Sequence, residues 1–451
     1  MNIKIFYVKD FKDFVRSPQS VLEGDSTKKN PKLKNAIQSA LTEKNPQAVE
    51  YAYNELLRAV AKSFHSNVDI LYTGNLFCKT DIKGLKFDFN FGLRLEIPKG
   101  DWHVKISDFD TEQIFFDKDV SNIRLISSDF YYIHWQFEIS RKGKKIFTYV
   151  FNPENMPVLF VCTSTALGDT LAFMPYVREF QKIHKCKISV WVRKYMQDLL
   201  QNFYPEFEFV ENPSLNYYAT FYGSFIIGEL LALPADSRTY PLDRIGGMIL
   251  DIKNTPQLPK FTPTKNPEIT EPYVCIAVQA SSTPKGWLYP DGWDIVVRYL
   301  KSLGYRVLCI DKNKTYTEFG YTIKKPEQAE DFTGEISLID RANMIYYADF
   351  FIGLSSGLSW LAYYVNCPVV MICGFTQDKN EFFTPYRVAN RFVCNGCYND
   401  IRAPSFGSKI CHKYKGTDRE LECQKKISPR QVINAIERLI VEKNLIPPVL
   451  Q

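Results

Sequence analysis

Two stretches of the sequence alternate short apolar strands with helices, and this pattern constrains the fold more than any other feature. The first stretch begins at Pro157 and the second at Tyr273. Their strands are continuously apolar, which is typical of parallel sheets covered by helices. The predicted strands and helices are, in order, 157–162, 171–184, 187–192 and 194–203, then 273–278, 292–303, 305–310, 338–347, 350–353, 358–365 and 369–373. We therefore predict an α/β protein with two Rossmann-like halves.

The segments around these two stretches predict the remaining domains. Residues 254–272 contain five prolines and no hydrophobic period, which is typical of an interdomain linker. Residues 87–97 alternate apolar and polar side chains, as a half-buried strand does, and predict a small antiparallel β-domain ahead of the two halves. The expected limits are a helical extension at 1–66, the β-domain at 67–155, the two halves at 156–258 and 259–393, a four-cysteine segment at 394–427 and a C-terminal helix at 428–451.

Charge and hydropathy exclude several classes of protein. The net charge is only +6 over 451 residues, and the lysines are scattered, so we expect no nucleic-acid partner. Residues 1–16 lack the apolar core of a signal peptide. Residues 350–377 carry no charged side chain, but glycine, serine and proline interrupt the run, so we expect buried strands and a helix instead of a membrane span. Most cysteines stand singly, several of them among apolar residues, which favours a reducing, cytoplasmic location.

A Gly-Asp-Thr motif follows the first predicted parallel strand. Ligands of doubly wound sheets bind outside the carboxyl ends of the strands, so Gly168, Asp169 and Thr170 would border a cleft. Gly168 would permit a tight turn, and Asp169 would lie at the start of a helix, where it could act as a general base. The alternative is that Asp169 only caps that helix, and the motif alone favours this role.

A polar loop follows the first strand of the second half. Its hydroxyls at Ser281 and Ser282, its backbone N–H groups and its one lysine, Lys285, suit a diphosphate. A solvated loop without a ligand is an equally good interpretation of this segment alone.

A serine- and glycine-rich turn lies between a later strand and helix of the second half. Ser355 or Ser356 could cap the helix, and Gly357 would let phosphate oxygens approach its positive end. The alternative is a plain serine cap with a packing glycine. The sequence lacks the dinucleotide fingerprint G-x-G-x-x-G and the P-loop lysine, which disfavours hydride and ATP chemistry. Together the three motifs describe a cleft with a carboxylate on one wall and a diphosphate site on the other.

These three motifs together resemble those of the ADP-heptose:lipopolysaccharide heptosyltransferases, which have the GT-B fold of two Rossmann-like domains. The similarity covers about residues 157–450 and rests on the Gly-Asp turn, on Ser-Ser-x-x-Lys-x-Trp and on Ser-Gly-Leu-Ser. The last motif of that family usually reads Asp-Thr-Gly-Leu-Ser-His, and here Ser355 replaces the aspartate and Trp360 the histidine. The residues expected to bind the donor are Gly168, Thr170, Ser281, Ser282, Lys285, Ser355, Ser356 and Gly357.

A β-domain ahead of the halves and a late four-cysteine cluster make the chain more similar to the bacterial autotransporter heptosyltransferases. This resemblance covers residues from about 67 to the end, and residues 1–66 look like an extension beyond it. It implies ADP-glycero-manno-heptose as the donor and hydroxyls, those of serine, in autotransporter adhesin repeats as acceptors. It also implies a ring-shaped dodecamer.

The four clustered cysteines have the spacing of a metal site. Cys394 and Cys397 form a Cys-x2-Cys pair, and Cys411 and Cys423 follow as two further thiolates that would complete a tetrahedron. The segment between them has little apolar core of its own, so binding of one structural metal would fold it. The residues alone favour zinc, whereas the family resemblance implies iron held by four cysteines.

For the sugar transfer that the resemblance implies, the motifs predict a single displacement with inversion. Asp169 would take the proton of the acceptor hydroxyl, while Lys285 and the helix end at 356–357 would stabilise the departing diphosphate, so that no catalytic metal is required. Two alternatives remain open on the sequence: a lipopolysaccharide core heptosyltransferase with a lipid-linked acceptor, and an adaptor with a metal finger that binds a nucleotide without turnover.

Overall fold

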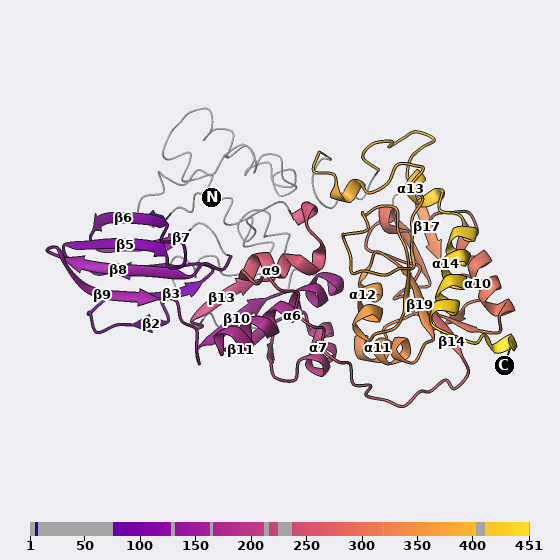
Figure 1. Cartoon of the computed structure of the whole chain (residues 1–451), viewed down its shortest axis with the longest axis horizontal. Helices are drawn as coiled ribbons and strands as arrows, with labels where there is room; N and C mark the ends of the chain where they lie inside the picture. The colour runs from indigo at the N-terminus through magenta and orange to yellow at the C-terminus, as the bar shows by residue number, and fades with distance from the viewer. Residues whose placement is uncertain are drawn as a thin grey trace.

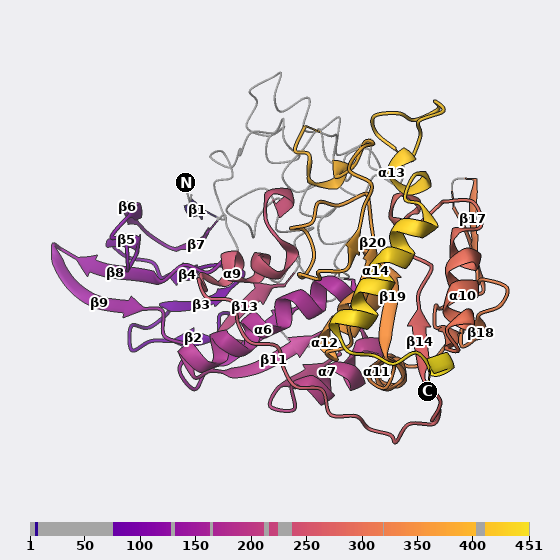
Figure 2. The ribbon, with the colours of Figure 1, turned by 45° about the vertical axis from the view of Figure 1, so that its right-hand side comes forward.

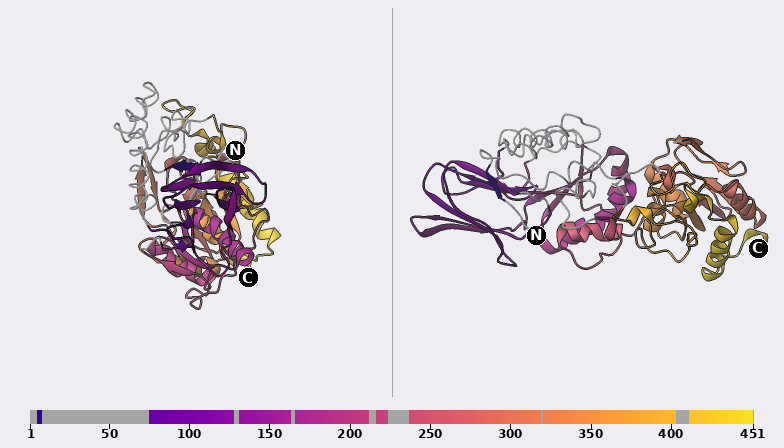
Figure 3. Two further views of the ribbon diagram at one scale, coloured as in Figure 1. Left: turned by 90° about the vertical axis from the view of Figure 1, so that its left-hand side faces the viewer. Right: turned by 90° about the horizontal axis from the view of Figure 1, so that it is seen from above.

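The computed structural model describes residues 5–7, 75–127, 131–162, 166–211, 216–223, 237–318, 320–402 and 411–450. The predicted helical extension at 1–66 lies outside these residues except for β1 (Ile5–Tyr7), which pairs antiparallel with β7 (Ile123–Ser127). The antiparallel region, the first α/β half and the second α/β half follow one another along the long axis of the molecule (Figures 1 and 3).

The antiparallel region contains a four-stranded sheet with the order β6-β5-β8-β9. Its strands are β5 (Trp102–Asp108), β6 (Ile114–Val120), β8 (Trp135–Arg141) and β9 (Lys144–Val150). The turn between the last two strands has positive φ at Lys142 and Gly143, 50° and 73°, as a two-residue hairpin turn requires. The antiparallel β-structure predicted here is therefore present.

The other antiparallel strands share one sheet with the strands of the first half. Its order among the described residues is β1-β7-β4-β3-β13-β10-β11-β12, and β2 also pairs with β3. At the joint, β3 lies parallel to β13. A buried ion pair between Arg94 Nη2 and Asp88 Oδ2, 2.6 Å apart, lies beside this joint. The strands are β2 (Cys78–Lys79), β3 (Lys86–Asn90), β4 (Arg94–Ile97), β10 (Pro157–Val161), β11 (Lys187–Trp191), β12 (Glu208–Val210) and β13 (Ala219–Tyr222), and the helices are α6 (Leu167–His184), α7 (Gln197–Phe203) and α9 (Ile245–Leu250).

The second half is a parallel sheet with the order β18-β15-β14-β19-β20-β21. Helices α10 and α14 cover one face, where α14 crosses the half diagonally (Figure 2). The elements are β14 (Tyr273–Ile276), α10 (Gly292–Ser302), β15 (Arg306–Cys309), the hairpin β16 (Thr315–Glu318) and β17 (Tyr321–Lys324), β18 (Glu330–Asp331), α11 (Leu338–Tyr346), β19 (Phe350–Leu354), α12 (Gly357–Tyr364), β20 (Val369–Ile372), β21 (Arg387–Val388), α13 (Glu422–Lys425) and α14 (Pro429–Glu442).

The strands and helices predicted in both α/β stretches are present, although α6 begins at Leu167 instead of Leu171. The uncharged run at 350–377 forms β19, α12 and β20, as expected. In the part of the chain that the structure describes, no helix combines the length and apolarity that crossing a membrane requires.

The first turns of α6 and α12 hold the two halves together. A Cβ added at Gly168 would lie 2.7 Å from Trp360 Cδ1, and one added at Gly357 would lie 2.9 Å from Leu167 Cβ. Neither glycine has a positive φ, so close packing and not turn geometry requires glycine at both positions. The tight-turn role predicted for Gly168 is therefore wrong. One apolar core runs from the antiparallel region through the first half to α12.

We expect Gly168→Ala to lower stability, because the new methyl group collides with the buried Trp360 ring. Forced overpacking of this kind costs about 1–3 kcal/mol. Thermal unfolding of the single variant measures the loss. In the Gly168→Ala variant, Trp360→Leu removes the obstacle. Trp360→Leu should therefore lower the free energy of unfolding less in that variant than in the wild type. An equal loss of unfolding free energy on Trp360→Leu in the variant and in the wild type would contradict the collision.

Candidate functional site

The three predicted loops lie at the carboxyl ends of β10, β14 and β19, and the structure brings them together. The Gly168 and Gly357 turns are in contact through Trp360 and Leu167. Lys285 lies close enough to Asp169 for its charge to act on that carboxyl group. The predicted carboxylate and the predicted diphosphate loops therefore face the same junction between the halves.

Asp169 is the third residue of α6, and Ala166 occupies the N-cap position. Its Oδ2 accepts a hydrogen bond from the Ala166 backbone N–H at 3.1 Å. The expected alternative, that Asp169 is the N-cap residue itself, is therefore wrong in detail, because its side chain reaches back from the first turn as the acid of a capping box does. This contact engages one carboxylate oxygen, so it is compatible with a second role in catalysis.

Burial raises the pKa of Asp169 to about 6, against the opposing effects of the Lys285 charge and the Ala166 N–H group. A carboxylate with this pKa is largely ionised at neutral pH and is a stronger base than an exposed aspartate. These are the properties that a general base near neutral pH requires.

The lysine loop is held from two sides. Residues Thr283–Lys285 form a short 3-10 turn after Ser282. Glu318 Oε2 accepts a hydrogen bond from the Thr283 N–H at 3.0 Å, and Gln424 Nε2 donates to the Pro284 carbonyl at 2.6 Å. Thr283 and Pro284 are buried, so a freely solvated loop does not describe this segment. Ser282 and Lys285 are half-buried at its surface, whereas Ser281 is exposed.

A buried acid accepts a hydrogen bond from the serine turn and fixes it to the protein interior. Ser355 is buried, and its hydroxyl donates to Glu381 Oε1. Glu381 Oε2 in turn accepts from Arg387 Nη1 at 2.7 Å. Ser356 holds the N-cap position of α12 without a side-chain capping bond in the described structure, and Gly357 is the first residue of that helix. The backbone of this turn is therefore fixed from the protein side.

Two buried acids of this site were missed from the sequence. Glu381 lies in the polar run after β20. Asp311 follows β15 and accepts from the backbone N–H groups of Val278 and Gln279 at 2.7 and 3.1 Å. Burial raises the pKa of Asp311 to about 6, opposed by those two hydrogen bonds. An acid directly after an apolar strand was the available signal for Asp311.

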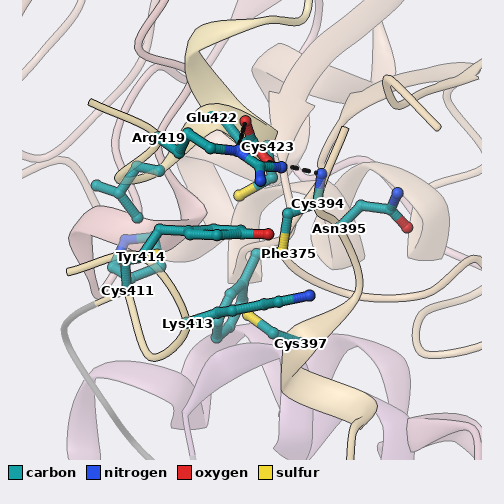
Figure 4. Close-up of a pocket in the computed structure, with 12 residues that line it drawn as sticks. Phe375, Cys394, Asn395, Cys397, Cys411, Lys413, Tyr414, Arg419, Glu422 and Cys423 are labelled. Atoms are coloured by element: carbon teal, nitrogen blue, oxygen red, sulfur yellow. Dashed lines mark hydrogen bonds and ion pairs between the residues drawn. The ribbon is translucent and has the colours of Figure 1, made fainter. Parts of the chain in front are cut away.

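All four clustered cysteines line one cavity of about 20 Å³, together with Phe375 and Pro284 (Figure 4). Burial is the main cause that raises the pKa of Cys397 to about 12, and the nearby thiols of Cys394 and Cys411 add to it. A cation in the cavity would reverse this effect, because it favours the thiolate. In the described ranges no three His, Cys, Asp or Glu side chains are close enough together to hold an ion. Four thiols are a donor set whose chemistry suits a metal ion, but their sulfurs would need to move inward to bind one.

Family models match both parts of the chain. Residues 82–143 match the N-terminal domain of glycosyltransferase TibC, and residues 246–409 match glycosyltransferase family 9 (heptosyltransferase).

Three relatives extend this similarity over most of the chain. The autotransporter heptosyltransferase Aah of Escherichia coli is 38% identical over 365 residues, which cover 79% of this chain and 93% of Aah. The autotransporter heptosyltransferase TibC of Escherichia coli O78:H11 is 36% identical over 370 residues, 80% of this chain and 91% of TibC. An inactive autotransporter heptosyltransferase, BimC of Burkholderia thailandensis, is 32% identical over 366 residues, 79% of this chain and 86% of BimC.

A solved structure supports the same fold. The crystal structure of dodecameric iron-containing heptosyltransferase TibC in complex with ADP-D-beta-D-heptose matches with a TM-score of 0.76 at 35% identity. The match covers 81% of this chain and 97% of that one.

Proposed function

Since this chain belongs to the autotransporter heptosyltransferases of glycosyltransferase family 9, we propose that it transfers heptose from ADP-glycero-manno-heptose to serine hydroxyls of autotransporter adhesin repeats. The observation that carries this proposal is that Asp169 and Lys285, from opposite halves, lie close enough for the lysine charge to lower the pKa of the aspartate. The proposal includes the GT-B fold, a cytoplasmic location and a dodecameric assembly, on the similarity to TibC.

The geometry supports a single displacement with inversion at the anomeric carbon. Asp169 takes the proton of the acceptor hydroxyl as the oxygen attacks that carbon. The bond from the anomeric carbon to the diphosphate oxygen breaks, and the negative charge develops on ADP. Lys285 and the N-terminus of α12 at Gly357 stabilise this charge.

We further propose that Cys394, Cys397, Cys411 and Cys423 hold one structural metal ion. Their thiolates would supply four sulfur ligands that close the segment around the ion. Iron is proposed on the similarity to iron-containing TibC, and zinc is the alternative that the cysteine spacing alone favours.

The test of the proposed function is mass spectrometry of an adhesin passenger co-produced with this protein. Added heptose mass on serines with the wild type, and none with Asp169→Asn, is the expected result. Transfer to a lipid-linked core acceptor instead would identify a lipopolysaccharide core heptosyltransferase. Binding of ADP-heptose without transfer to any acceptor would identify a nucleotide-binding adaptor, a possibility that the inactive relative BimC makes worth testing.

We expect Lys285→Ala to weaken ADP binding about 10- to 100-fold, because a charge-assisted hydrogen bond to phosphate contributes about 1.5–3 kcal/mol. Calorimetric titration with ADP measures the effect. Lys312→Ala is the control, since Lys312 also follows a strand of this half but pairs with Glu335 at 3.0 Å. Wild-type affinity in the Lys285 variant would place this side chain outside the donor site.

A further inference from the structure

Gln424 connects the cysteine cavity to the lysine loop. It follows Cys423 directly and is fully buried. Its side-chain Nε2 donates to the Pro284 carbonyl at 2.6 Å, and its backbone carbonyl accepts from the Leu288 N–H at 3.3 Å. The other side-chain atom, Oε1, is buried and has no hydrogen-bond partner in the described part of the chain. A buried amide with one unsatisfied oxygen is costly, which suggests a role beyond packing.

The lysine loop also forms one wall of the cysteine cavity. Pro284, whose carbonyl Gln424 binds, lines the cavity beside Cys423 and immediately precedes Lys285. A second contact fixes the same loop to the same segment, because Trp287 Nε1 donates to the Ile427 carbonyl at 2.8 Å. Only Gln424 and Pro284, joined by one hydrogen bond, thus separate Cys423 from Lys285, the proposed diphosphate ligand.

We propose that Gln424 is a positioning residue that transmits closure of the cysteine site to Lys285, so that metal binding increases the affinity for a nucleoside diphosphate. This inference rests on the proposed function and deepens it. Drawing the Cys423 thiolate inward fixes α13, a helix of only four residues that also carries Gln424. A fixed Gln424 holds the Pro284 carbonyl and restricts the backbone of Lys285. The loop then binds a diphosphate with less loss of conformational entropy.

The first test is Gln424→Met, which keeps the length and apolar volume of the side chain but removes the donor to Pro284. In metal-loaded protein it should weaken ADP binding about tenfold, the effect of one well-placed hydrogen bond. Removal of the metal from the wild type should weaken ADP binding to a similar extent. Because both changes act through the same loop, metal removal should have little further effect in Gln424→Met or in Lys285→Ala.

A second readout does not involve the donor. The rate at which an amine-reactive acetylating reagent modifies Lys285 is measured by peptide mass spectrometry. Metal removal and Gln424→Met should change this rate in the same direction and to a similar extent. The matched control is Asn390→Ala, because Asn390 Nδ2 donates to the Lys426 carbonyl at 2.7 Å and ties the same segment to a different neighbour. Asn390→Ala should keep wild-type values in both measurements, and circular dichroism checks that every variant is folded.

The possible outcomes separate this inference from the proposed function. A folded Gln424→Met variant with wild-type ADP affinity and wild-type Lys285 acetylation would overturn the inference, even if transfer of heptose is found. The wild type could bind no ADP while its Lys285 acetylation still responds to Gln424→Met and to metal removal. That result would overturn the proposed donor and retain the positioning role of Gln424. Equal effects of Asn390→Ala and Gln424→Met would show general loosening of the segment and would also overturn it.

Discussion

Replacing Asp169 with asparagine is expected to lower heptose transfer about 1,000-fold, because general-base catalysis typically contributes 10²- to 10⁴-fold. The amide keeps an oxygen that can accept from the Ala166 N–H, so the helix start is preserved. ADP binding should stay within twofold of the wild type, and single-turnover transfer from ADP-heptose measures the chemical step. Asp198→Asn is the control, since Asp198 is also a first-turn acid of a helix in the same half.

The pH dependence follows from the raised pKa of Asp169. The wild-type transfer rate should rise as pH increases through about 6, where this carboxyl group loses its proton and becomes able to act as a base. The folded state holds the Asp169 proton more tightly than the unfolded chain does. The free energy of unfolding should therefore fall as the pH rises from about 4 to about 6. Asp169→Asn should therefore be at least as stable as the wild type at pH 7. Transfer by this variant within a few-fold of the wild type would leave Asp169 with only its helix contact.

Replacing Cys394 with serine is expected to remove the proposed metal ion and to destabilise the segment from Cys394 to Cys423. Four thiolates on one ion close a loop of about 30 residues, and a cross-link of that span stabilises a protein by about 3 kcal/mol. The metal content measured by elemental analysis should fall from one ion per chain to nearly none, and thermal unfolding should begin at lower temperature. X-ray absorption of the wild type should report four sulfur ligands.

A half-buried cysteine outside the cluster provides the control for this prediction. Cys78→Ser, in the antiparallel region, should keep the full metal content. A wild type that is folded, assembled and active without any bound metal would contradict the structural role of the ion. A metal content that survives in Cys394→Ser but is lost in Cys423→Ser would show that a different set of ligands holds it.

Local patterns in the sequence predicted the two α/β halves, because apolar strands and helices differ in period and are bounded by glycine and proline. The start of α6 was placed too late, since Gly168 and Asp169 are poor helix formers and resemble a loop. The parallel pairing of β3 with β13 was not predicted. These strands are more than 100 residues apart, and their contact depends on the assembled sheet and not on either segment alone.

The position of the candidate site residues was predictable where it follows from the end of a predicted strand. Asp169 and Lys285 each follow a predicted strand end, and the structure brings both to the junction between the halves. Glu381 and Gln424 were not identified, because each sits in a polar run like many others and its importance comes only from its partner. Those partners, Ser355 and Pro284, are 26 and 140 residues away along the chain.

The two helix ends that meet at Gly168 and Gly357 are electrically unequal. α6 carries an acid, Asp169, in its first turn, whereas α12 has no acidic residue there. The partial positive charge at the start of α6 is therefore offset by a side chain of its own, and that of α12 is left for an external anion. In the proposed mechanism this asymmetry would give the reaction a direction across the junction: negative charge would be supplied on the side of the attacking oxygen and received on the side of the leaving group.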